Sequence, residues 1–257
     1  MLLCIDIGNT NTVLATFEDD KIVHSWRVKT DARATADEWG LLFRGLLAGD
    51  NVEVTGVAAC STVPAALRSL RSMLARYYRG FPAVVVEPGV RTGVQLAIDN
   101  PKEVGADRVV NTLAAYTLYG GPSIVVDFGT TTNFDVISAR GEFLGGAFAP
   151  GIEVSFDALA ARAAQLRRVE PVPPRSVIGK NTVECLQSGM YFGFGGQVDR
   201  IVERMVEELG EVTAVIATGG LAPVVLGECT TVTHHEPMLT LLGLQMVYAR
   251  NVPVPDA

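Results

Sequence analysis

Short apolar runs separated by polar turns open the chain and predict β-strands. Three such runs follow one another, at Leu2–Ile5, about Val13–Phe17 and about Ile22–Val28. Turn residues such as Asp19-Asp20-Lys21 lie between them, which is typical of neighbouring strands joined by tight turns. The first part of the chain is therefore predicted to form three antiparallel strands.

The same order of elements recurs near the middle of the chain. A second apolar run begins at Ser123 and is followed by strand-like runs at about Phe134–Ile137 and Phe143–Phe148. The first run leads into Asp6-Ile7-Gly8-Asn9-Thr10, and the second leads into Asp127-Phe128-Gly129-Thr130. The offset is close to half of the chain, so the pattern indicates two similar halves.

Helical patterns alternate with further apolar runs in both halves. Thr35-Ala36-Asp37-Glu38 has the form of a capping box, and Pro64 suits the first turn of another helix. Further strand-like runs lie at Gly56–Ala59, Ala83–Val86, Val212–Ala217 and Thr230–Val232. The alternation predicts an α/β protein with two domains, residues 1–119 and 120–257, each a mixed sheet covered by helices, with a cleft between them.

Composition and charge narrow the class of protein. Nearly half of the 257 residues are hydrophobic, which is enough for a substantial core, and the formal net charge of −7 argues against general binding to nucleic acid. The start of the chain lacks the features of a signal peptide, and no apolar run reaches the about 18 residues of a membrane span. We therefore expect a cytoplasmic protein that binds neither nucleic acid nor membranes.

The cysteines do not suggest a metal site or disulfides. Cys4, Cys60, Cys185 and Cys229 are far apart and form no CxxC pair. Buried free thiols are the expected reading.

The repeated turn Asp-x-Gly-x-Thr suits the binding of phosphate. Glycine lets the backbone approach a phosphate, turn amides and hydroxyls donate hydrogen bonds, and the aspartate can hold a hydrated Mg²⁺. A single copy would fit an ordinary hairpin as well, but two copies at matching positions favour phosphate binding from both halves.

A third glycine-rich turn, Gly219-Gly220, follows a predicted strand and could accommodate a nucleoside. Two phosphate turns followed by such a turn are the layout of the actin and hexokinase superfamily of ATP-handling proteins. GxxxxGK[ST] and a GxGxxG that opens a helix are both missing from the sequence, so P-loop and Rossmann folds have no support.

One segment before the midpoint carries the residue types that phosphoryl transfer to an alcohol requires. Gly105-Ala106-Asp107-Arg108 supplies a carboxylate that can accept the hydroxyl proton and a cation that can bind an acidic acceptor. The same pair would also fit a surface ion pair at a helix start. With Asp99-Asn100-Pro101, the two Asp-Gly-Thr turns and Gly179-Lys180-Asn181-Thr182, the chain resembles the type III pantothenate kinases over almost its whole length.

The resemblance implies a duplicated RNase H-like fold and ATP-dependent phosphorylation of pantothenate, the first step of coenzyme A synthesis. It implies that Asp107 is the general base and that Gly105, Ala106, Asp107 and Arg108 bind pantothenate. ATP is expected to contact the first turn, the second turn and the glycine pair: Asp6, Ile7, Gly8, Asn9, Thr10, Asn11, Thr12, Val13, Thr130, Gly219 and Gly220.

Cations and a second subunit also follow from the resemblance. Asp6 is expected to position Mg²⁺, and Asp127 to bind a monovalent cation, K⁺ or NH₄⁺. Thr182 matches a substrate contact that the family supplies from the neighbouring subunit, which implies a homodimer, although it could equally be the N-cap of a helix that starts near Val183. Ile98 stands where family members often have a tyrosine that contacts the substrate, so affinity for pantothenate could differ.

Two alternatives remain at this stage. One is a kinase of the same superfamily that phosphorylates a sugar or another alcohol. The other is a non-catalytic regulator that keeps the ATP-binding fold, although retention of Asp6, Asp107 and Asp127 together favours an enzyme.

Overall fold

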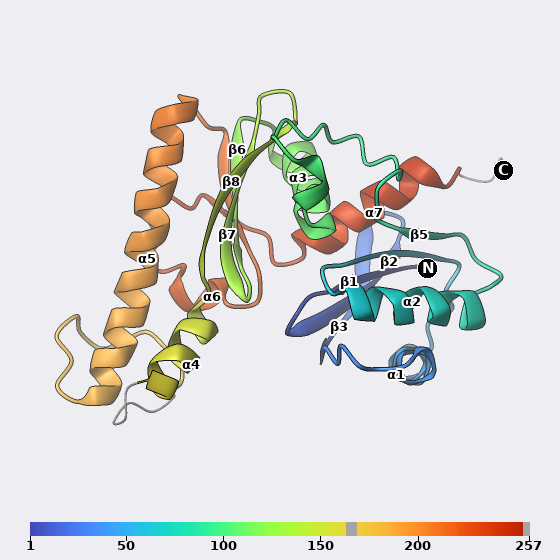
Figure 1. Ribbon diagram of the computed structural model, residues 1–257, viewed down its shortest axis with the longest axis horizontal. Helices are drawn as coiled ribbons and strands as arrows, with labels where there is room; N and C mark the ends of the chain where they lie inside the picture. The colour runs from blue at the N-terminus through green and yellow to red at the C-terminus, as the bar shows by residue number, and fades with distance from the viewer. Residues whose placement is uncertain (163–168, 254–257) are drawn as a thin grey trace. The chain divides into compact units, whose positions relative to one another are not determined.

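The computed structural model describes residues 1–162 and 169–253. Contacts within the chain group into two compact units, shown with the ribbon in Figure 1. Unit 1 comprises Met1–Val94, Asp99–Ala114 and Leu239–Ala257, and unit 2 comprises Gln95–Ile98 and Ala115–Met238.

Unit 1 contains a five-stranded mixed sheet in the order β3-β2-β1-β4-β5. Its strands are β1 (Leu2–Ile7), β2 (Asn11–Glu18), β3 (Lys21–Lys29), β4 (Gly56–Ser61) and β5 (Ala83–Val85). The first three strands are antiparallel, as predicted, while β4 and β5 run parallel to β1. The carboxyl ends of β1 and β4 therefore meet at one edge of the sheet.

Helices cover both faces of this sheet. They are α1 (Ala36–Gly49), α2 (Pro64–Tyr77), the first part of α3 (Ala106–Tyr119) and α7 (Leu239–Asn251), with a short 3₁₀ helix at Pro101–Glu103. The predicted capping box at the start of α1 is present, because the Glu38 amide donates to Thr35 Oγ1 at 3.3 Å and the Thr35 amide donates to Glu38 Oε2 at 2.7 Å.

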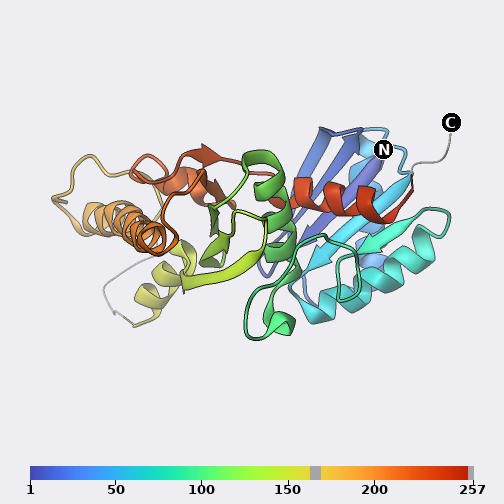
Figure 2. The ribbon, with the colours of Figure 1, turned by 90° about the horizontal axis from the view of Figure 1, so that it is seen from above.

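The two faces of β1 have different neighbours. Leu3, Ile5 and Ile7 are fully buried in a core with α1 and α2. Side chains alternate along a strand, so Cys4 and Asp6 point to the opposite face. Figures 1 and 2 show α7 on that opposite face of the unit 1 sheet.

Unit 2 repeats this topology. Its sheet has the order β8-β7-β6-β9-β10, which matches β3-β2-β1-β4-β5 strand for strand. The strands are β6 (Ser123–Phe128), β7 (Thr131–Ile137), β8 (Phe143–Pro150), β9 (Ala214–Thr218) and β10 (His234–His235). The duplication predicted from the sequence is thus present in the strand order of the two units.

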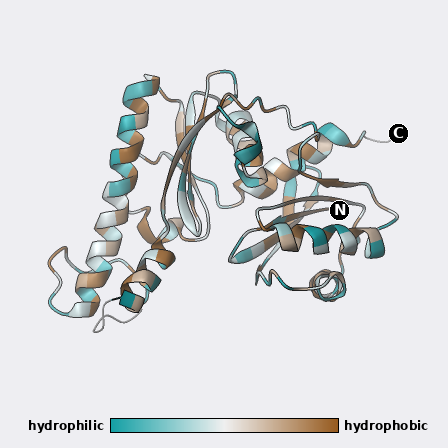
Figure 3. Cartoon of the chain, viewed as in Figure 1, coloured by the Kyte–Doolittle hydropathy of each residue, from teal (hydrophilic) through white to brown (hydrophobic). Residues whose placement is uncertain are grey.

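Three helices pack on one face of the second sheet: α4 (Ile152–Arg162), α5 (Thr182–Leu209) and α6 (Ala222–Val225). Ile124, Val126 and Phe128 of β6 share a buried core with them. Hydrophilic and hydrophobic residues alternate around α2 and α5, as expected for helices with one buried face (Figure 3). Asp127, which lies between two of these core residues, points away from this core.

Two local features differ from the sequence predictions. The last helix, α7, groups with unit 1, so the packed units are not the two consecutive stretches 1–119 and 120–257. Residues 230–232 are not a strand, because the backbone amides and hydroxyls of Thr230 and Thr231 all donate to the Asp199 carboxylate. The edge strand β10 forms just beyond them, at His234–His235.

Candidate active site

The first Asp-x-Gly-x-Thr turn connects β1 to β2. The Gly8 amide donates to the Asn11 carbonyl at 3.0 Å and closes the turn. Asn9, Thr10 and Asn11 are exposed, whereas Ile7 and Thr12 are buried. Of the predicted ATP-binding residues 6–13, the exposed ones therefore lie at the tip of the turn.

Asp6 sits at the base of this turn, within electrostatic reach of the Asp107 carboxylate. Its pKa is raised to about 7, first by burial and then by the negative charge of Asp107, while the Cys60 thiol and the positive charge of Arg27 act in the opposite direction. Burial and a second negative charge both favour the protonated form of a carboxyl group. The predicted Mg²⁺-positioning residue therefore feels the charge of the predicted general base within unit 1.

Asp107 lies in the first turn of α3, near the edge of the sheet where β4 ends. Its Oδ1 atom is buried and accepts no hydrogen bond within the described residues. Burial raises the pKa of Asp107, and the backbone amide and positive charge of Arg108 partly offset this effect. Gly105 lies so close that an added Cβ atom would be 2.4 Å from Asp107 Oδ1 and 3.8 Å from Thr62 Cγ2.

The second Asp-x-Gly-x-Thr turn has the same construction in unit 2. The Gly129 amide donates to the Thr131 carbonyl at 3.0 Å, and Thr130 is exposed at the tip. The Gly151 amide donates to the Thr130 carbonyl at 3.1 Å, which ties the turn to the end of β8. The predicted ATP contact Thr130 therefore occupies a fixed and accessible turn.

The glycine pair lies beside this second turn. Gly219 follows β9 with a φ of 91°, and an added Cβ would be 2.5 Å from Asp127 Oδ1 and 2.6 Å from the Phe128 carbonyl oxygen. The close approach requires glycine at this position. Asp127 and Gly219 are thus brought together, with a carboxylate and a carbonyl oxygen on one side of the turn.

Thr182 is the first residue of α5 and is exposed. Its alternative reading as an N-cap is wrong, because the cap is Asn181, whose Oδ1 accepts from the Glu184 amide at 3.0 Å. The Thr182 side chain is therefore not required for capping.

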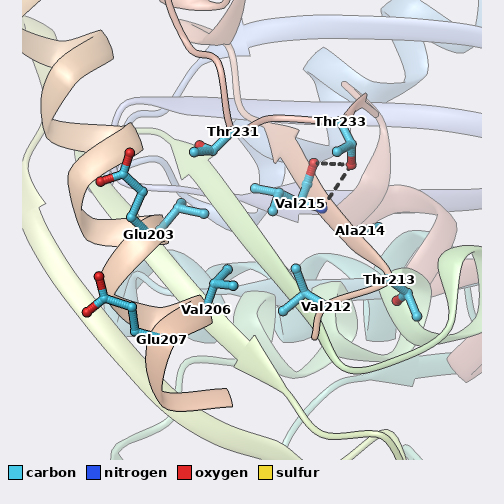
Figure 4. A pocket seen from close by; sticks show the side chains of 10 residues that line it. Glu203, Val206, Glu207, Val212, Thr213, Ala214, Val215, Thr231 and Thr233 are labelled. Atoms are coloured by element: carbon cyan, nitrogen blue, oxygen red, sulfur yellow. Dashed lines mark hydrogen bonds between the residues drawn. The ribbon is translucent and has the colours of Figure 1, made fainter. Parts of the chain in front are cut away.

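An apolar pocket of about 400 Å³ between α5 and β9 does not belong to this site. Val206, Val212 and Val215 line it, with Glu203 and Glu207 at one side (Figure 4). It lies at the amino end of β9, whereas Gly219 and Gly220 follow the carboxyl end of that strand.

Comparison with known proteins identifies the family. The profile of the type III pantothenate kinases matches residues 2–204. The type III pantothenate kinase of Salinispora arenicola is 84% identical over 252 residues, covering 98% of this chain and all of that protein, and that of Acidothermus cellulolyticus is 66% identical over 255 residues. The chain belongs to the type III pantothenate kinase family.

The match confirms the recognition made from the sequence. The chain is an ATP-dependent kinase whose acceptor is pantothenate, and the reaction is the first step of coenzyme A synthesis. The alternative of a sugar kinase and that of a non-catalytic regulator are therefore set aside.

Solved structures with the same fold support the fold prediction. An activator of 2-hydroxyisocaproyl-CoA dehydratase from Clostridium difficile, with bound ADPNP, aligns over 100% of this chain and 99% of its own at 12% identity and a TM-score of 0.55. An inorganic polyphosphate/ATP-glucomannokinase from Arthrobacter aligns over 97% and 98% at 16% identity and a TM-score of 0.52. At such identities the likeness concerns the fold, and it confirms the predicted two-lobed α/β class.

Sequence reasoning missed one residue of the site. Cys60 is a buried free thiol, as the sequence predicts, but its Sγ also donates to Asp6 Oδ1 at 3.3 Å. Burial and the two neighbouring carboxylates raise the pKa of Cys60, so the thiol stays protonated. Only the parallel pairing of β1 with β4, which no local pattern specifies, brings the two side chains together.

Proposed function

We propose that Asp107 is the general base that accepts the hydroxyl proton of pantothenate. The observation that carries this proposal is the buried Oδ1 atom of Asp107, which has no hydrogen-bond donor among the described residues. A buried carboxylate oxygen without a donor is costly, and a substrate hydroxyl would supply the missing hydrogen bond. The raised pKa of Asp107 makes the carboxylate a better proton acceptor than an exposed aspartate.

The same segment is proposed to bind the acceptor. Gly105, Ala106 and Arg108 flank Asp107 at the start of α3, where the amide groups of a helix N-terminus and a guanidinium favour an anion. Pantothenate carries one carboxylate, and Arg108 is the residue suited to it. Gly105 leaves the space next to Asp107 Oδ1 free of a side chain.

ATP is proposed to lie against three turns, whose exposed atoms suit phosphate and nucleoside groups. The first is formed by Asp6–Val13, the second includes Thr130, and the third is Gly219-Gly220. In the first turn, Asn9, Thr10 and Asn11 offer side chains and backbone groups, and the buried members Ile7 and Thr12 hold the turn in place.

Cations are proposed at two aspartates. Among the described residues there is no cluster of three His, Cys, Asp or Glu side chains that could enclose a metal ion. In kinases Mg²⁺ is held largely by phosphates and water with one or two carboxylates, and Asp6 would supply one of these. When bound, Mg²⁺ neutralises charge on the phosphates. Asp127, whose carboxylate lies with the Phe128 carbonyl beside Gly219, has the oxygen ligands that K⁺ or NH₄⁺ would use.

A homodimer is proposed in which Thr182 contacts the substrate bound to the partner. Apolar side chains around Thr182 are strongly exposed: Val177 by 62%, Ile178 by 72% and Val183 by 48%. Such a cluster is typical of a surface that a second protein covers.

We also propose that the protein acts in the cytoplasm, where ATP and K⁺ are plentiful. Among the residues that the structure describes, none of the helices is long and apolar enough to cross a bilayer. The acidic net charge supports the expectation that nucleic acid is not a partner.

The test is release of ADP with pantothenate, ATP and Mg²⁺, with K⁺ and again with Na⁺ in its place. Pantothenate-dependent turnover that falls without K⁺ is expected. Turnover that is unaffected by the replacement would overturn the cation assignment of Asp127. A folded protein that releases no ADP in K⁺ would overturn the assigned roles as a whole.

A further inference from the structure

The side chains of Asp6 and Cys60 face each other across two parallel strands. Asp6 of β1 and Cys60 of β4 are partners in register, and the Cys60 thiol donates to Asp6 Oδ1 at 3.3 Å. Cys60 is completely buried, and the structure has it as a free cysteine. The contact is therefore set by the pairing of two buried strand positions.

The next residues of both strands are also tied together. Ser61 Oγ donates to the Ile7 carbonyl at 3.1 Å, and the Thr62 amide donates to the same carbonyl at 3.2 Å. The end of β4 thus holds both the backbone and the side chain at the base of the first phosphate turn.

The internal duplication provides an independent comparison. In unit 2 the partner of Asp127 in the equivalent parallel pair is Thr218, a buried residue whose hydroxyl has one hydrogen to donate. In both units, therefore, the residue paired in register with the aspartate that begins the turn is buried and has a side chain with one donor hydrogen.

We infer that Cys60 is a positioning residue for the Asp6 carboxylate. A thiol donates only one hydrogen bond, so it fixes one carboxylate oxygen and leaves the other for the hydrated Mg²⁺ of the nucleotide. A side chain with several donor hydrogens, such as a lysine, would compete with the cation for both oxygens. The inference rests on the proposed role of Asp6.

Three variants separate positioning from packing. Cys60→Ala removes the donor, Cys60→Ser restores a donor of similar size, and Cys4→Ala is the matched control. Cys4 is equally buried and lies two residues before Asp6 on the same strand, so its replacement leaves a similar cavity. Binding of ATP is measured calorimetrically without pantothenate over a Mg²⁺ titration, and kcat and KM for ATP are measured in parallel.

Because thiols are weak donors, we expect Cys60→Ala to raise the Mg²⁺ concentration needed for half-maximal ATP binding by about three- to tenfold. Cys60→Ser should recover most of this loss, and Cys4→Ala should match the wild type in Mg²⁺ dependence even if its thermal stability falls. If Cys60→Ala and Cys4→Ala show the same Mg²⁺ dependence, or if Cys60→Ser does not recover, the inference about Cys60 is wrong and the proposed role of Asp6 still stands. If ATP binding by the wild type does not depend on the Mg²⁺ concentration, the proposed role of Asp6 is wrong, and the inference about Cys60 fails with it.

Discussion

The α-carbon of Gly219 faces the carboxylate of Asp127 so closely that a Cβ atom there would lie 2.5 Å from Oδ1. The φ of 91° at Gly219 is also one that other residues adopt at a cost. The turn after β9 thus fixes where the Asp127 carboxylate can lie, and the proposed monovalent cation depends on that position.

Gly219→Ala should therefore weaken activation by K⁺. Displacing a group that supports a metal ligand typically lowers metal affinity by about 10- to 100-fold, and we expect the K⁺ concentration for half-activation to rise within that range. Gly196→Ala in α5 is the control, because an added Cβ meets nothing within 4 Å among the described residues. A Gly219→Ala enzyme with an unchanged K⁺ activation curve would contradict the assignment of Asp127.

Asp107→Asn should abolish most turnover without preventing the binding of nucleotide. Asparagine keeps the shape of the side chain but cannot accept the hydroxyl proton, so kcat should fall by about 10²- to 10⁴-fold. Thermal stabilisation by ATP and Mg²⁺ should persist, which shows that the fold and the nucleotide turns are intact. A variant that is folded and keeps most of its rate would refute the role of Asp107 as general base.

The duplication, the strand order near each turn and the recognition of the family could all be predicted from the sequence. Hairpins and the capping box at Thr35 are local, so the residues that specify them are adjacent in the chain. Residues 230–232 show the limit of this approach, because their threonines suit a strand but bind Asp199 of α5 instead.

The pairs that define the site are set by long-range pairing. Asp6 meets Cys60 and Asp107 only after β4 has added in parallel to β1 and α3 has reached the end of that pair. Likewise, α7 lies against the unit 1 sheet although it is far from β1 and β4 in the sequence, with Tyr248 close to Gly56. A pattern in one stretch of sequence contains no information on such partners, which explains why Cys60 was missed.

The raised pKa of Asp6 predicts how stability depends on pH. The folded-state pKa is about 7, above the usual value of 3.8 for an aspartate, so the folded protein holds this proton more tightly than the unfolded chain. Stability from this group is present at low pH and is lost as the pH rises through about 7. Asparagine does not titrate, so Asp6→Asn should not lose stability as the pH rises. One unit of pKa shift corresponds to about 1.4 kcal/mol. The variant should therefore have a free energy of unfolding about 1–4 kcal/mol above that of the wild type near pH 8.

Urea unfolding of both proteins in EDTA, from about pH 4 to about pH 8, checks this prediction. Asp37→Asn is a control of opposite sign, since the pKa of Asp37 is lowered by Arg76 and Tyr77 and its contribution disappears at low pH instead. Asp6→Asn curves that run parallel to the wild type over the whole range would show that Asp6 titrates normally in the folded protein.

The proposed contact of Thr182 with the partner's substrate can be tested with mixed dimers. Thr182→Ala removes one hydrogen bond, so the KM for pantothenate should rise by about tenfold. A dimer that combines one Thr182→Ala subunit with one Asp107→Asn subunit, purified through two different tags, has one site with Asp107 and a partner's intact Thr182. Because the subunits are related by symmetry, such a dimer should show about half of the wild-type activity at limiting pantothenate. If Thr182 acted within its own subunit, neither site would be complete, and the mixed dimer would be no more active than half of the Thr182→Ala homodimer.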